Sequence, residues 1–232
     1  MSRVALFGAQ GFVGSAVHKS LVDQGAEVIA VSRSNFDEAL RGSYDYVINS
    51  AMPSARFKAK NDPMWDFKET VEKTALIFHK THFKKFIQIS SVSARCQLDT
   101  VYGRHKLAAE AIVNDGKHLV VRLGPMFGPT LKKGILIDML KGDPIFVNKA
   151  SRYAFAPLDF VADWISKNLD RRGMKEVGAH NSISLADLAQ KLDYNPKFEG
   201  QEDHQEMQGI ESNYPDVELV LAYMRNKRGK TE

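Results

Sequence analysis

The chain has 232 residues, of which 44% are hydrophobic and 26% are charged. This composition excludes general disorder and suffices for one domain, or for one domain with a small lobe. No apolar run approaches the about 18 residues of a membrane-spanning helix. The net charge of +4 is mild, and aromatic residues do not interleave with the basic ones. We therefore expect a soluble cytoplasmic protein that binds neither membranes nor nucleic acid.

The cysteine and the histidines carry no chemistry of their own in this sequence. Cys96 is the single cysteine, which excludes an intrachain disulfide and fits a reducing compartment. We expect it to be a structural, partly buried thiol, because no activating partner is evident. His79 and His82 lie three residues apart, but no third ligand follows at a recognisable spacing. The sequence predicts no metal site.

The chain opens with an apolar strand at Arg3–Phe7, a glycine-rich turn, a helix, and a second strand at Glu27–Val31. This order is typical of a dinucleotide-binding unit. Its glycines let the backbone turn sharply and approach a phosphate at the helix N-terminus. The residues that we expect around the cofactor here are Gly8, Gln10, Gly11, Phe12, Val13 and Gly14.

The second strand ends in Ser32-Arg33-Ser34. Proteins that bind NAD place a carboxylate here, on the ribose 2′-hydroxyl. No acid is present in this chain, whereas Arg33 can pair with a 2′-phosphate and both serines can donate to it. The sequence favours NADP over NAD; the alternative is that Arg33 covers the adenine or points to solvent.

A strand is expected near Tyr46–Ala51, and a helix over Met64–Thr81 that begins after Asp62-Pro63, a cap and first-turn pair. The next strand ends at Ser91, and the helix after it carries Tyr102 and Lys106. Residues four apart share one face of a helix. A lysine beside a phenol lowers the phenol's pKa, and a serine at a neighbouring strand end can bond the same substrate oxygen. We predict that Ser91, Tyr102 and Lys106 are catalytic in hydride chemistry on a carbonyl or alcohol.

Strands and helices alternate through about residue 123, which predicts an α/β fold with a doubly wound parallel (Rossmann) sheet. The expected dinucleotide-binding core covers residues 1–125 and 143–183, with a small C-terminal substrate-binding lobe at 126–142 and 184–232. The later elements expected are helices at 135–141, 159–169, 184–192 and 215–226, strands at 145–147 and 175–179, and a loop at 199–211.

The glycine spacing, Ser91 and the Tyr-x-x-x-Lys motif together resemble the short-chain dehydrogenase/reductase superfamily, in its extended branch. That branch includes NAD(P)-dependent nucleotide-sugar epimerases, dehydratases and keto-sugar reductases. The resemblance covers about residues 3–192. It is carried further by Tyr46–Ala51, Val120–Pro129 and Arg152–Ala162.

The resemblance also implies roles for individual residues. Lys106 and Tyr102 would contact the nicotinamide ribose. Arg152 would bind a nucleotide diphosphate, or it is a plain surface arginine. The further positions implied are Asn49, Ser50, Ala51 and Pro125 for the cofactor, and Met52, Ser91, Met126 and Arg152 for the substrate.

The chain departs from the family pattern in several places, among them its short length and the compressed gap between Ser91 and Tyr102. The segment before Tyr46 is short, so the usual third strand is expected to be missing or reduced. Thr70 stands where the family has an asparagine that assists a proton relay from the lysine. Val92 and Ser93 replace the Asp-Glu pair of the dehydratases, which argues against dehydration.

Three functions remain open from the sequence. The preference for NADP and the short segment before Tyr46 favour a reductase of a keto sugar, one linked to a nucleotide, or of a related small ketone; a redox-neutral nucleotide-sugar epimerase is the alternative. A non-catalytic NADP sensor is the third, although such relatives usually lose the tyrosine or the lysine. Family members often dimerise through the two helices here expected at 64–81 and 102–114; the exposed faces of these helices are not clearly apolar in the sequence, so the oligomeric state stays open.

Overall fold

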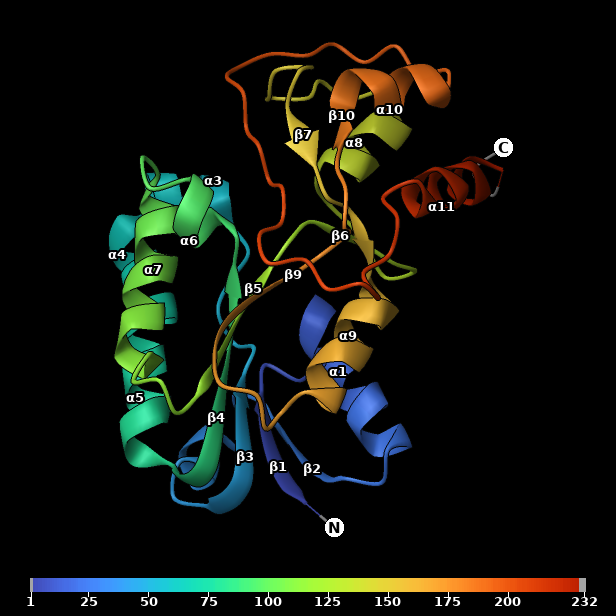
Figure 1. Ribbon diagram of the computed structural model, residues 1–232. Helices are drawn as coiled ribbons and strands as arrows, with labels where there is room; N and C mark the ends of the chain where they lie inside the picture. The colour runs from blue at the N-terminus through green and yellow to red at the C-terminus, as the bar shows by residue number, and fades with distance from the viewer. Residues whose placement is uncertain (1, 230–232) are drawn as a thin grey trace. The chain divides into compact units, whose positions relative to one another are not determined.

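The computed structural model describes residues 2–229 and divides into two compact units (Figure 1). The first unit comprises the chain up to Leu123 together with Ala162–Lys175. The second comprises Gly124–Val161 and the chain from Glu176 onward. In the described part of the chain, no helix combines the length and the hydropathy needed to cross a bilayer.

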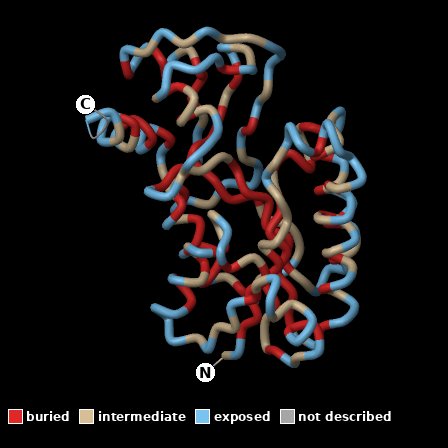
Figure 2. Tube along the Cα trace, turned by 180° about the vertical axis from the view of Figure 1, so that it is seen from behind, coloured by how far each residue is buried: buried red, intermediate tan, exposed pale blue. Residues whose placement is uncertain are grey.

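The first unit is built on a six-stranded sheet in the order β2-β1-β3-β4-β5-β9. The pairs from β2 to β5 are all parallel, which confirms the predicted doubly wound α/β fold. Its strands are apolar runs that lie buried between helices, and Figure 2 shows that buried residues follow them. The strands are β1 (Arg3–Phe7), β2 (Glu27–Val31), β3 (Ser43–Asn49), β4 (His82–Ser91), β5 (Leu119–Leu123) and β9 (Gly173–Val177).

The sheet ends at β2 within the described residues, so the third strand that the family usually has beyond it is absent, as expected from the short segment. Only the short helix α2 (Phe36–Ala39) lies between β2 and β3. The chain therefore leaves one side of β1 and returns on its other side. This change of direction makes a topological switch point at the carboxyl ends of β1 and β3, where open α/β sheets bind ligands.

Helices cover both faces of the sheet (Figure 1). One layer holds α1 (Phe12–Asp23) and α9 (Leu158–Lys167), joined by a 2.6 Å hydrogen bond that Ser20 Oγ donates to Asp163 Oδ1. The opposite layer holds α3 (Arg56–Asn61), α4 (Pro63–Phe67), α5 (Lys73–Lys80), α6 (Ser93–Cys96) and α7 (Val101–Val113). A π-helical turn, η1 (Lys68–Glu72), interrupts the predicted helix over 64–81.

The second unit has its own hydrophobic core, which includes Tyr153, Phe155 and Ile183. Residues 143–161 and 176–183 belong to this unit, whereas the sequence assigned 143–183 to the dinucleotide-binding core. The expected strand at 145–147 is reduced to a single bridge between Ile145 and Phe198. The elements of this unit are β6 (Met126–Phe127) with β8 (Ala156–Pro157), β7 (Arg152–Tyr153) with β10 (Ile183–Ser184), α8 (Ile135–Lys141), α10 (Leu185–Lys191) and α11 (Leu219–Arg228).

Candidate functional site

The glycine-rich turn lies at the switch point, between the end of β1 and the start of α1. Gly8 has a φ of +81°, and a Cβ added to it would lie 2.5 Å from the Ser50 carbonyl oxygen. A Cβ on Gly14 would lie 2.1 Å from the Gly8 oxygen. The turn is thus closed tightly on itself and on the end of β3, and only glycine fits at these two positions.

The N-terminus of α1 is open to a ligand. Its cap residue, Gly11, has no side chain to bond the first amides, and no acidic residue lies in the first turn. Amides at such an end carry partial positive charge and bind phosphate. The cradle around Gly8 and the uncapped helix end therefore fit the pyrophosphate of a dinucleotide, with Gln10, Phe12 and Val13 beside it.

The loop after β2 is ordered by a residue that sequence reasoning missed. Asn35 Oδ1 accepts hydrogen bonds from the Ser32 amide at 2.7 Å and the Ser32 hydroxyl at 3.2 Å. The Ser32 and Ser34 hydroxyls are 2.8 Å apart. Arg33 between them is exposed. The loop presents two hydroxyls and a guanidinium, with no carboxylate among them.

Residues 49–53 connect the glycine-rich turn to the predicted triad. Asn49, fully buried, donates to Gln88 Oε1 at 3.1 Å, and Gln88 Nε2 donates to Met52 Sδ at 3.2 Å. Lys106 Nζ then donates to the Pro53 carbonyl oxygen at 3.1 Å. Because Ser50 closes on Gly8, this segment brings together the residues that the sequence assigned to cofactor and to catalysis.

The structure brings Ser91, Tyr102 and Lys106 together. The hydroxyls of Ser91 and Tyr102 share a hydrogen bond, and Lys106 Nζ lies 5.1 Å from the centroid of the Tyr102 ring. The helix that carries the last two begins at Thr100, whose Oγ1 accepts from the Gly103 amide at 3.0 Å. The exposed fractions of Tyr102 and Lys106 are only 6% and 3%.

Burial dominates the ionisation of Tyr102 and Lys106. It raises the pKa of Tyr102, while the charge of Arg56 and the hydrogen bond with Ser91 lower it. Burial lowers the pKa of Lys106 to about 7, opposed by the charges of Asp66 and Glu110. The positive charge that acts on Tyr102 in this structure thus belongs chiefly to Arg56, not to the lysine that the sequence suggested.

Two buried carboxylates support the triad, and sequence reasoning missed both. Glu110 accepts from Ser90 Oγ at 2.6 Å and from the guanidinium of Arg122 at 2.7 Å. Asp66 Oδ2 lies 2.8 Å from His105 Nδ1, although the Asp66 side chain is completely buried. Glu110 follows Lys106 by four residues, and this helical spacing could have revealed it in the sequence. No sequence pattern reveals Asp66, because only tertiary packing brings α4 to α7.

Thr70, at the position of the family's asparagine, lies in the π-helical turn. Its side chain is completely buried, and its Oγ1 has no hydrogen-bond partner among the described residues. Its carbonyl oxygen accepts from Thr74 Oγ1 at 2.7 Å, and Thr74 in turn accepts from Asn49. Thr70 thus joins the polar layer behind Asn49 through its backbone carbonyl, not through its hydroxyl.

Three of the predicted residues belong to the second unit. The Pro125 carbonyl oxygen accepts from the Ala156 amide at 3.0 Å, and Met126 pairs with Ala156 in the β6–β8 ladder. Arg152 donates to the Ser182 carbonyl oxygen at 2.8 Å and lies 3.3 Å from Glu206 Oε1. Arg152 therefore already has partners within its own unit.

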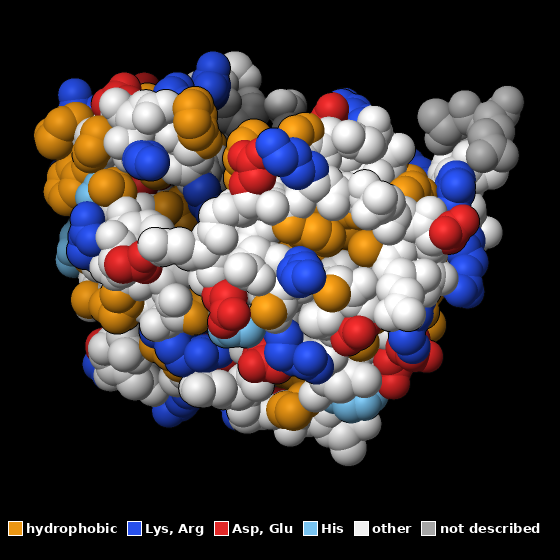
Figure 3. All heavy atoms as spheres, turned by 90° about the horizontal axis from the view of Figure 1, so that it is seen from above, with side chains coloured by type: hydrophobic (Ala, Val, Ile, Leu, Met, Phe, Trp, Pro, Cys, Tyr) orange, Lys and Arg blue, Asp and Glu red, His pale blue; other side chains and the backbone are white. Residues whose placement is uncertain are grey.

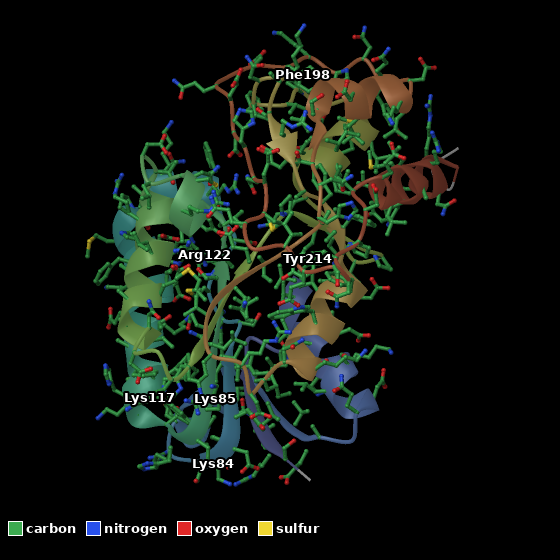
Figure 4. The ribbon with its side chains drawn as sticks, viewed as in Figure 1. Lys84, Lys85, Lys117, Arg122, Phe198 and Tyr214 are labelled. Carbon is green, nitrogen blue, oxygen red and sulfur yellow. The ribbon has the colours of Figure 1, made fainter. Side chains whose placement is uncertain are left out.

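A cavity of about 600 Å³ lies at the amino ends of β1, β3 and β4, and its lining includes Arg3, Ser43 and Lys84. In Figure 4, Lys84 and Lys85 mark this end of β4, and Arg122 lies nearer the other end of the sheet. This cavity is away from Gly8 and Ser91, which close the opposite ends of their strands. Among the described residues there is no cluster of side chains suited to a metal ion, and Cys96 is partly exposed.

Solved structures with this fold include several that act on or bind nucleotide sugars. The UDP-N-acetylglucosamine 4-epimerase of Methanobrevibacter ruminantium M1, in complex with UDP-N-acetylmuramic acid, is 15% identical. The alignment covers 99% of this chain and 98% of that one, with a TM-score of 0.78. RMD from Pseudomonas aeruginosa, complexed with NADPH, is 15% identical over 100% of both chains, with a TM-score of 0.76.

The human epimerase family protein SDR39U1, solved with NADPH, is 16% identical and covers 97% of this chain and 99% of its own, with a TM-score of 0.75. No curated protein sequence matches this chain. A family model does match, over residues 4–140, which is more than half of the chain and includes the glycine-rich turn and the triad. The chain therefore belongs to the NAD dependent epimerase/dehydratase family, whose members are NAD(P)-dependent enzymes.

Proposed function

We propose that this protein is an NADPH-dependent reductase of a keto sugar and that this sugar is linked to a nucleotide. The observation that carries the proposal is the hydrogen bond between Ser91 and Tyr102 beside the buried Lys106. A phenol and a serine hydroxyl held together can bond one carbonyl oxygen and give it a proton.

The chain's own residues would act as follows. The first turn of α1, from Gly11 onward, would bind the pyrophosphate, and Lys106 would bond the nicotinamide ribose. The bound cofactor would supply the hydride. Ser91 would orient the substrate oxygen, and Tyr102 would donate its proton to that oxygen in reduction or remove a proton in the reverse direction.

Two features support reduction with NADPH. The loop Ser32-Arg33-Ser34 offers hydroxyls and a positive charge, which suit a 2′-phosphate. Val92 and Ser93 are both completely buried and neither is acidic, so the acid pair used for dehydration is absent from those positions.

A redox-neutral epimerase of a nucleotide sugar is the second candidate. It is favoured by similar solved structures, which include UDP-glucose 4-epimerases of Thermotoga maritima and Thermus thermophilus. Such an enzyme returns the hydride to the same sugar and has no need to exchange its cofactor. Tight retention of the oxidised cofactor therefore distinguishes the two candidates.

We also propose that the protein forms a homodimer through α4, α5 and α7. These helices expose large apolar side chains, among them Met64 at 65%, Phe67 at 40% and Leu107 at 38%. In Figure 3 hydrophobic side chains gather along the edge at the left, the side on which Figure 1 shows these helices. Apolar groups that gather in this way mark interaction surfaces.

The test of the proposed function has two steps. The freshly purified protein is denatured and its released nicotinamide cofactor is quantified. A reductase releases little cofactor or a reduced one, whereas near-stoichiometric oxidised cofactor favours the epimerase. Nucleoside-diphosphate keto sugars are then assayed with NADPH in the protein and in Tyr102→Phe. We expect the variant to lose at least about 100-fold in kcat, because the proton donor is gone.

The variant should still bind NADPH, since Tyr102 does not hold the pyrophosphate. Turnover retained in Tyr102→Phe would remove this residue from the mechanism. Cofactor binding without turnover in the parent protein, for every keto sugar tried, would favour the sensor.

A further inference from the structure

A hydrogen-bonded chain leads from the candidate catalytic serine to an arginine that the sequence did not suggest. Arg56, on α3, donates from Nη2 to Ser93 Oγ at 3.1 Å. Ser93 Oγ also accepts from Ser91 Oγ at 3.1 Å, and the Ser93 amide donates to Ser91 Oγ at 3.2 Å. Ser93 is completely buried. The two contacts from Ser93 thus hold the rotamer of Ser91, and Arg56 in turn holds Ser93.

The same guanidinium lies over the catalytic tyrosine. Arg56 Cζ is 5.7 Å from the centroid of the Tyr102 ring. The other groups that face Tyr102 are Ser91 on β4, Asp66 on α4 and, from its own helix α7, Lys106. Arginine stays protonated throughout the working pH range, whereas Lys106 titrates at about 7. Arg56 is therefore the permanent positive charge at this cluster.

We propose that Arg56 is a positioning residue for the reaction: it holds Ser91 on the Tyr102 hydroxyl through Ser93, and it keeps a constant positive charge over the Tyr102 ring. The inference rests on the proposed function, because it assigns Arg56 a part in the proton transfer by Tyr102. Two effects follow, one on geometry and one on charge, and they can be separated by substitution.

The experiment measures the pH profile of kcat/KM for alcohol oxidation with NADP⁺, the direction in which Tyr102 is the base. In Arg56→Gln both effects are lost. We expect the half-maximal pH to rise by about one unit, the lower end of the effect of one nearby charge, because Arg56 is exposed. We also expect kcat to fall about 10-fold, since Ser91 loses its support.

Two further variants separate the effects. Arg56→Lys keeps the charge but not the planar fork, so kcat should fall while the half-maximal pH stays. Ser93→Ala should do the same. The matched control is Lys58→Gln, which removes a charge from the same helix; Lys58 lies over Trp65, away from the cluster. Its profile should coincide with that of the parent protein.

The result that overturns the inference is a pH profile of Arg56→Gln that coincides with the parent's, or one that Lys58→Gln reproduces. Circular dichroism checks whether each variant is folded. If Arg56→Gln does not fold, the inference is tested by the other two variants: an unchanged kcat in both Arg56→Lys and Ser93→Ala overturns it. Tyr102→Phe is measured in parallel. If it retains turnover, the proposed function itself fails; if it is inactive while Arg56→Gln behaves as the parent, only the role of Arg56 fails.

Discussion

At the scale of single residues, the candidate site is a set of ionisable groups whose charged forms are disfavoured by burial. Lys106 is 3% exposed, and its neighbours Asp66 and Glu110 offset only part of the cost of burying its charge. Burying a cation disfavours its protonated form. The chain therefore keeps at its centre a lysine that weakens the fold near neutral pH, which is expected of a functional rather than a structural residue.

Lys106 should make stability depend on pH. Its pKa is about 7 in the folded protein, below the ordinary value of 10.5 that it regains on unfolding. Between these two values the unfolded chain binds more protons, so the free energy of unfolding should rise with pH, by at most about 1.4 kcal/mol per unit. Urea unfolding at several pH values between about 7 and 9 measures this slope. Lys106→Met should flatten it, and equal slopes in the two proteins would contradict the assignment.

Arg33 should decide the choice of cofactor. If it pairs with the 2′-phosphate, Arg33→Ala should weaken NADPH binding about 10- to 100-fold and leave NADH binding nearly unchanged. Fluorescence titration with each cofactor gives the ratio of the two dissociation constants. Arg41→Ala, which removes another exposed arginine eight residues further along the chain, is the control. A ratio that Arg33→Ala does not alter would mean that this residue points to solvent.

At the scale of secondary-structure elements, local patterns predict what local forces determine. The strands of the parallel sheet, the glycine-rich turn and the helix of Tyr102 follow from apolar runs, glycine spacing and helical periodicity. The π-helical turn η1 and the short helices α3 and α6 were not predicted. Their residues have no strong periodicity, and tertiary packing determines their backbone. Arg56 lies on one of these elements, α3, which explains why it was missed.

The packing of α6 against α7 depends on a glycine within the Tyr-x-x-x-Lys motif. A Cβ on Gly103 would lie 2.0 Å from the Gln97 carbonyl oxygen, which belongs to the backbone and cannot turn aside. We expect Gly103→Ala to destabilise the protein by about 1–3 kcal/mol and to lower kcat by shifting Tyr102. Thermal unfolding and steady-state kinetics check both effects.

The control for that substitution is Gly229→Ala. At Gly229 the nearest atom would be 3.9 Å from the added Cβ, and φ is −67°. The control should leave stability within about 0.5 kcal/mol of the parent's. A Gly103→Ala protein as stable as this control would show that α6 and α7 can separate without cost.

At the scale of the whole molecule, the first unit could be predicted from the sequence more fully than the second. The first is continuous in sequence except for Ala162–Lys175, and its sheet follows from alternating strands and helices. The second combines two distant segments around one core that includes Leu136, Tyr153 and Val220. Its pairings, such as β7 with β10, join strands of only two residues. Strands of two residues are too short to show the hydrophobic alternation by which strands are predicted from sequence.

Association between copies is the property of the whole molecule that the exposed apolar side chains argue for. Leu76 on α5 and Leu107 on α7 are 39% and 38% exposed, and burying such side chains is the main driving force for dimerisation. A glutamate in place of each would put four charges into the proposed dimer interface. Leu76→Glu combined with Leu107→Glu should therefore convert a dimer to a monomer in sedimentation velocity. The control, Val22→Glu, changes a side chain that is 49% exposed on α1, in the opposite helical layer, and should remain dimeric. A parent protein that sediments as a monomer at every concentration would reject the dimer, and a double variant that stays dimeric would move the interface elsewhere.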